Sequence, residues 1–243
     1  MPKDLLLLGA NAPDMELLRS RLVRIGHRVV PAKTPEAAHA LLRVGGARVG
    51  AVIVPADLAV VNLGAAVSVL RQLVPGGELV FVGAGRDPGS AGRARLRQAG
   101  VSVALFDPID LHTLRFQVNR ALAGNHFPAR LRRGTQRAPA DWQVVAQAGG
   151  RTKEGRIYSI SPSGGYVVLQ QPWMVRSNVE LRGTLPGGME LHASGRVMMT
   201  NVPGNVMRAS LPVGMGVRFD QLSEATSIAL LMYANQRSEA LAL

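Results

Sequence analysis

The sequence predicts two domains of different class: an α/β domain with a doubly wound parallel sheet, then an all-β domain with a six-stranded antiparallel barrel and a C-terminal helix. Three observations predict this. Apolar runs alternate with helical patterns over residues 4–125, the periodicity changes to two from Trp142 onward, and 243 residues suffice for two cores of ordinary size. We therefore expect an α/β domain at 1–125, a linker at 126–141 and a barrel domain at 142–243.

Short runs rich in Val and Leu predict the strands of the first domain. They are Leu5–Leu8, Val49–Val54, Leu79–Val82 and Val101–Phe106, with Gly26–Val30 as a further edge strand. Segments of helical spacing lie between them, and Asp14 and Thr34 stand where helix starts need a capping oxygen, with Pro35 suited to a first turn. Strands that alternate with helices predict a parallel sheet covered on both faces.

Turn-formers separate short strands in the second domain. The six predicted strands are Gly155–Ser159, Gly165–Leu169, Val179–Leu185, Glu190–Met199, Val206–Leu211 and Gly216–Phe219. Closely spaced strands with few helices favour a closed antiparallel barrel, which leaves few edges exposed. Leu222–Asn235 then reads as a helix that plugs or flanks the barrel, with Ala225, Ile228, Ala229 and Met232 on its apolar face and Asp220 or Ser223 as its cap.

Two polar motifs suggest the function. The first is Arg133-Gly-Thr-Gln-Arg137, in a basic stretch that also holds Arg130 and Arg132, and the second is Ser159-Ile-Ser-Pro-Ser-Gly164. A guanidinium offers a rigid fork of donors that fits phosphate oxygens or the O6/N7 edge of guanine, and its flat face can stack on a base. The pair therefore points to a ligand that carries both phosphate and guanine.

These motifs, with the late strand Gly214–Phe219 and the helix after it, resemble the PilZ domain, the bacterial receptor module for cyclic di-GMP. The resemblance runs from about Arg130 to the C-terminus. It implies that Arg133 and Arg137 grip guanine edges and phosphates, that Ser161 donates to phosphate, and that Gly164 lets the backbone approach the ligand closely. Arg132 is similar to a residue of family members that hold two stacked copies of the ligand.

Ser159 departs from the family motif, which begins with Asp or Asn at this position. A carboxylate would accept charge-assisted hydrogen bonds from the guanine N1 and N2 donors, whereas a hydroxyl is a neutral acceptor. The difference should cost about 1–2 kcal/mol, or about 5- to 30-fold in dissociation constant. Ser159 is therefore a candidate ligand contact of reduced strength.

The first domain, over about Pro2–Asn125, resembles the receiver domain of response regulators. A working receiver needs an acidic pair after its first strand, an aspartate ending its third and a lysine after its fifth. This chain has Gly9-Ala10-Asn11, Pro55 and Asp107-Pro108 there, and Asp57 lies two residues beyond the phosphorylation position without acidic partners. We expect a pseudo-receiver scaffold, with a possible homodimer contact through its fourth and fifth helices, Gly92–Gln98 and Leu111–Leu122.

The composition narrows the function classes. The net charge of +12 is spread evenly, with 15 Lys and Arg against 9 Asp and Glu in residues 1–125 and 13 against 7 in residues 126–243, which argues against a dedicated nucleic-acid surface. The absence of cysteine excludes disulfides and thiolate chemistry and fits a reducing cytoplasm. No apolar run reaches 18 residues, and the five histidines are scattered without metal-ligand spacing, so we expect neither a membrane span nor an enzyme.

The sequence therefore predicts a non-enzymatic cyclic di-GMP effector without a cofactor, which signals by protein contact with an unidentified partner. The resemblance implies control of motility or surface polysaccharide. Two alternatives stay open: a PilZ-type adaptor that binds no nucleotide, which Ser159 favours, and a basic nucleic-acid-associated regulator, which the net charge favours.

Overall fold

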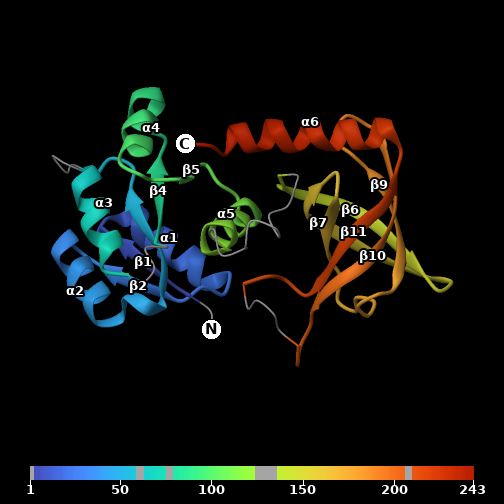
Figure 1. The fold of residues 1–243 in the computed structure, drawn as a ribbon, viewed down its shortest axis with the longest axis horizontal. Helices are drawn as coiled ribbons and strands as arrows, with labels where there is room; N and C mark the ends of the chain where they lie inside the picture. The colour runs from blue at the N-terminus through green and yellow to red at the C-terminus, as the bar shows by residue number, and fades with distance from the viewer. Residues whose placement is uncertain (1–2, 59–62, 75–78, 124–135, 206–209) are drawn as a thin grey trace. The chain divides into compact units, whose positions relative to one another are not determined.

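The computed structural model describes residues 3–58, 63–74, 79–123, 136–205 and 210–243. The chain divides into two compact units, one made of Met1–Arg132 with Leu241–Leu243 and the other of Arg133–Ala240 (Figure 1). The chain thus leaves the first unit once and returns to it for its last three residues. The second unit's first strand begins at Ala138, inside the span that the sequence assigned to a linker.

A five-stranded parallel sheet forms the first unit, as the sequence predicts. Its strands are β1 (Asp4–Leu8), β2 (Val29–Ala32), β3 (Val49–Pro55), β4 (Val80–Arg86) and β5 (Val103–Asp107). Its helices are α1 (Pro13–Arg24), α2 (Pro35–Gly45), α3 (Leu63–Gln72), α4 (Gly89–Gln98) and α5 (Leu111–Ala123), with a short 3-10 turn at Gly46–Arg48. The strand order β2-β1-β3-β4-β5 is that of receiver-like doubly wound domains. The expected receiver-like fold is therefore confirmed.

Alternate residues of β1 separate the two hydrophobic layers of this unit. Leu5 and Leu7 belong to the layer that contains the buried side chains of α1 and α5, and Leu6 and Leu8 belong to the layer of α2, α3 and α4. In α5, Leu114 and Val118 are core residues, with Leu111 and Leu122 partly buried against the same layer. The apolar stripe of this helix is therefore used within the unit.

The helix starts show one confirmed cap and one correction. Thr34 caps α2, because its Oγ1 accepts a hydrogen bond from the Ala37 N–H at 3.2 Å, and Pro35 occupies the first turn. Asp14 is not a cap: α1 begins at Pro13, with Ala12 in the capping position, two residues before Asp14. Asp14 instead lies in the first turn, where its negative charge complements the helix dipole.

A closed six-stranded antiparallel barrel forms the second unit. Its strands are β6 (Ala138–Ala148), β7 (Arg151–Ser161), β8 (Gly164–Val168), β9 (Asn178–Thr184), β10 (Glu190–Asn201) and β11 (Gly214–Leu222). The order around the barrel is β10-β11-β8-β7-β6-β9, closed by the pairing of β9 with β10. The predicted barrel of six strands followed by a helix is confirmed.

One strand was assigned wrongly from the sequence. Of the predicted strand Val206–Leu211, residues 206–209 lie outside the described residues, and Ser210 and Leu211 lie in a turn. The barrel reaches six strands through β6, which the sequence analysis did not predict. β7 starts four residues earlier than expected, at Arg151. The inward positions of β6 are largely alanine, at Ala138, Ala140 and Ala146, so its apolar alternation is weak in the sequence.

The C-terminal helix α6 (Glu224–Ala240) packs on the barrel through a face that shares only Ala229 with the predicted one, since Ala225 is exposed. Leu230, Thr226 and Ala234 are buried, whereas Ile228 and Met232 are 51% and 67% exposed. Apolar residues occur on both sides of this helix, so periodicity alone did not identify the packed side. Ser223 is the cap, since its Oγ accepts from the Thr226 N–H at 3.1 Å.

Within the described ranges, no helix is at once long and apolar enough to cross a membrane.

Candidate ligand site at the Gly164 turn

The second motif forms the tight turn between β7 and β8. Ser161 ends β7 and pairs with Gly164, the first residue of β8. The Ser161 hydroxyl donates to the Gly164 carbonyl oxygen at 3.2 Å and lies 3.1 Å from the Ser163 hydroxyl. Because the Ser161 side chain is fully buried, its hydroxyl braces the turn from inside.

Gly164 is required by the barrel itself. Its φ of +155° lies in a region that favours glycine, and it pairs with Arg218 of β11. A β-carbon on this residue would lie 2.3 Å from the Val217 carbonyl oxygen, far inside van der Waals contact. Any side chain here would push β8 away from β11.

The same position brings the two sequence motifs together. A β-carbon on Gly164 would lie 3.3 Å from Nη2 of Arg137, so the guanidinium of the first motif reaches the glycine of the second. Arg137 is half-buried and directly precedes β6. Arg132 and Arg133, the other predicted arginine contacts, lie outside the described residues.

The start of β6, which directly follows Arg137, pairs with β7 and contacts α6. Ala138 pairs with Ile160, and Pro139 pairs with Ser159. The Pro139 carbonyl oxygen also accepts a hydrogen bond from the Tyr233 hydroxyl of α6 at 2.7 Å. Burial raises the pKa of Tyr233, which keeps the phenol protonated as a donor. The helix thus anchors the strand that carries the arginine.

Ser159 lies in the barrel wall, two residues before Ser161. It is 4% exposed and sits between Pro139 of β6 and Tyr166 of β8. Tyr166 is fixed as well, since its hydroxyl donates to the Pro212 carbonyl oxygen at 2.7 Å and burial raises its pKa. An acidic residue in place of Ser159 would therefore start from a largely dehydrated position.

Two further arginines near the turn were not predicted as site residues. Arg218 pairs with Gly164 on one side and with Arg196 of β10 on the other, and both side chains are exposed. Asp220 holds Arg218 through hydrogen bonds of 3.1 and 3.2 Å to one carboxylate oxygen. Cross-strand pairing creates this proximity, and nothing in the linear sequence signals it.

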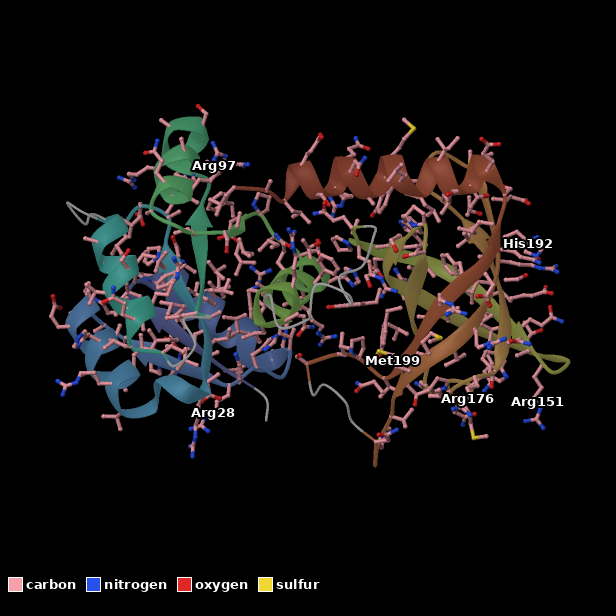
Figure 2. All side chains as sticks on the ribbon, in the orientation of Figure 1. Arg28, Arg97, Arg151, Arg176, His192 and Met199 are labelled. Atoms are coloured by element: carbon pink, nitrogen blue, oxygen red, sulfur yellow. The ribbon has the colours of Figure 1, made fainter. Side chains whose placement is uncertain are left out.

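The resulting surface suits an anion. Arg137 reaches Gly164 and Arg218 pairs with it, while Arg196 pairs with Arg218 one strand further along and Asp220 binds Arg218. Guanidinium groups bind phosphate with two parallel hydrogen bonds. Figure 2 shows other barrel arginines, such as Arg151 and Arg176, that project outward at separate places.

The receiver-like unit lacks the groups of a phosphorylation site at the strand ends. Gly9 follows β1, Pro55 ends β3, and Asp107 ends β5 beside Arg21 of α1, whose Nη1 lies 3.5 Å from its carboxylate. Arg21 also donates to the Ile109 carbonyl oxygen. In the described part of the chain, no group of three or more His, Asp or Glu side chains is arranged to hold a metal ion.

No protein-family model matches this sequence, and no curated protein matches it either. Solved structures resemble each half. A PilZ domain of Escherichia coli YcgR with c-di-GMP is 14% identical over 45% of this chain and 93% of that chain, with a TM-score of 0.36. The Bacillus subtilis inhibitor of motility MotI/DgrA is 21% identical over 47% of this chain, with a TM-score of 0.40, and the match spans 57% of that protein.

The first half is similar to the receiver domain of a sensor histidine kinase from Pseudomonas aeruginosa. That match has 18% identity and a TM-score of 0.43 and covers 51% of this chain and 99% of that chain. At these identities the likeness concerns the fold.

Proposed function

We propose that this chain is a non-enzymatic effector that binds cyclic di-GMP at the Gly164 turn and signals through protein contact. The regulated process in this proposal is motility or surface polysaccharide production. The observation that carries it is the approach of the Arg137 guanidinium to Gly164, which joins the two motifs in one place.

The roles of the individual groups follow from their chemistry. Arg137 grips a phosphate or the O6/N7 edge of guanine beside Gly164. Arg133 and Arg132, four and five residues earlier in the sequence, supply further guanidinium groups for the ligand. Arg218 adds positive charge from β11, although its bonds to Asp220 reduce its availability. The Ser161 hydroxyl keeps the turn in shape.

Isothermal titration with cyclic di-GMP tests the proposal on the intact chain. We expect saturable binding that Arg137→Ala or Arg133→Ala weakens by about tenfold or more, because each removes a charge-assisted contact. Arg151→Ala is the matched control, since it removes the same charge from an exposed position at the start of β7. Absence of binding at high micromolar ligand, or equal losses in all three variants, would refute the proposal.

A specific observation supports a second candidate, an adaptor that binds no nucleotide. Gly164 is explained by its contact with β11, and the Ser161 hydroxyl by its bond across the turn, so both have structural roles without a ligand. Ser159 stands where the PilZ motif has Asp or Asn. If the native chain shows no binding and Ser159→Asp creates it, the adaptor function is the correct one.

A further inference from the structure

We infer that the surface formed by α4, β5 and α5 of the first unit is a peptide-docking surface, and that its resident occupant is the chain's own Leu241–Leu243. These three residues belong to the first unit, separated in sequence from the rest of it by the whole barrel. The inference is independent of nucleotide binding in the second unit.

Three side chains recognise the main chain of the segment. Gln117 Nε2 of α5 donates to the Leu241 carbonyl oxygen at 3.1 Å, and Arg93 Nη1 of α4 donates to that of Ala242 at 3.1 Å. Arg97 Nη1, one turn further along α4, donates to the Leu243 main-chain oxygen. Each successive residue is thus held by a different donor, which fixes the register of the segment.

One apolar side chain anchors the segment Leu241–Leu243. Leu243 is 9% exposed and is a member of the hydrophobic cluster that includes Leu96 of α4 and Ala104 of β5. A buried leucine in an otherwise main-chain contact gives the surface a preference for an apolar side chain at this position. Main-chain hydrogen bonds supply affinity and the side-chain site supplies specificity, as in other peptide-recognition modes.

Contacts within the unit position the recognising groups. Asp87 accepts two hydrogen bonds from Arg93, at 3.0 and 2.6 Å, and the guanidinium lies 5.2 Å from the centre of the Phe106 ring. Because Nε and Nη2 of Arg93 bind Asp87, Nη1 is left to donate to the segment. Gln117 is fully buried and also donates to the Ala104 carbonyl oxygen at 3.2 Å. The donors are therefore prearranged, which lowers the ordering cost of binding a peptide.

Occupancy has a consequence for partners of this unit. The helices that the sequence suggested for homodimerisation are α4 and α5. They carry the three side chains that donate to Leu241–Leu243, called the tail below. A second protein that binds the same donors must displace Leu241–Leu243. The tail is thus an intramolecular competitor for that surface.

The test uses a chain that ends at Ala240 and a fluorescent peptide with the sequence of residues 236–243. Fluorescence anisotropy should show saturable binding to the shortened chain and at least tenfold weaker binding to the intact chain, whose surface is occupied. A peptide carrying Leu243→Asp should not bind. Within the shortened chain, Arg97→Ala should weaken binding at least tenfold, whereas Arg28→Ala, an exposed arginine outside the docking surface, should not.

Equal binding to the two chains, or no binding to a folded shortened chain, would overturn the inference. If circular dichroism shows that the shortened chain is unfolded, the full-length variant Leu243→Asp is used in its place. In this variant the tail should detach while the first unit stays folded. Failure of that variant to bind the peptide also overturns the inference. A dimer that becomes monomeric on removal of the tail would show that the occupant comes from a second copy, which contradicts the intramolecular form.

Discussion

Tyr233 of α6 and Pro139 of β6 are joined by a hydrogen bond of 2.7 Å, 94 residues apart in the sequence. Pro139 lies two residues after Arg137, so this bond links the C-terminal helix to the arginine of the candidate site. The Tyr233 ring also meets Trp142 edge to face, with 4.7 Å between ring centres. The position of Arg137 therefore depends on the packing of α6.

Tyr233→Phe should destabilise the barrel by about 1–3 kcal/mol, because it leaves the buried Pro139 carbonyl without its donor while it keeps the ring contact. Both tryptophans of the chain, Trp142 and Trp173, lie in the barrel, so tryptophan fluorescence follows the unfolding of this unit in urea. An unchanged midpoint would show that the bond contributes nothing.

Gly164→Ala should destabilise the barrel by more than about 1 kcal/mol, since alanine meets both the unfavourable φ and the Val217 carbonyl oxygen. Gly187→Ala is the matched control. Gly187 has a φ of +91° but open space around its β-position, so it reports the backbone conformation alone. Equal losses of stability in the two variants would refute the importance of the close approach to β11.

Ser159→Asp should strengthen cyclic di-GMP binding about 5- to 30-fold if the proposed site is correct, because a carboxylate accepts charge-assisted bonds from guanine. The same change should lower the stability of the ligand-free barrel, since the position is 4% exposed. Titration calorimetry and urea unfolding with and without ligand measure the two effects. Stronger binding together with an unchanged ligand-free stability would contradict the buried placement of this side chain.

The stability of the first unit should depend on pH through His27. Burial, with the positive charge of Arg115 as a second cause, lowers the pKa of His27 from 6.5 to about 4. Between these values the unfolded chain binds more protons than the folded chain, so stability is full above pH 6.5 and falls as the pH drops toward 4. The contribution is at most about 3 kcal/mol.

Thermal unfolding followed by circular dichroism between pH 4 and 7 checks this dependence. His27→Gln should flatten the pH profile, whereas His192→Gln, at an exposed position in the barrel, should leave it unchanged. A profile of His27→Gln that still falls toward low pH would assign the effect to other groups.

The sequence predicted the first unit well because buried parallel strands appear as continuous apolar runs. The predicted runs Leu5–Leu8 and Val49–Val54 differ from β1 and β3 by one residue at one end. The barrel was harder, because β6 directs small alanines inward and carries Pro139 near its start. Its apolar alternation therefore gave no clear strand signal.

The candidate site was only partly predictable. Local motifs identified Arg137, Ser161 and Gly164, but the pairing of Arg218 with Gly164 and of Arg196 with Arg218 depends on which strands are neighbours in the barrel. The docking of Leu241–Leu243 depends on contacts with α4 and α5, more than 120 residues earlier in the sequence. Neither feature leaves a periodic pattern.

The return of the last three residues to the first unit affects how the protein can be dissected. A receiver-like fragment that stops after α5 loses Leu243 from its hydrophobic layer and deprives the fully buried Gln117 of one acceptor. Such a fragment should aggregate or expose an apolar surface that Leu241–Leu243 covers in the whole protein. Interactions detected with the fragment would then result from the loss of these residues. Studies of this half alone need those residues added back.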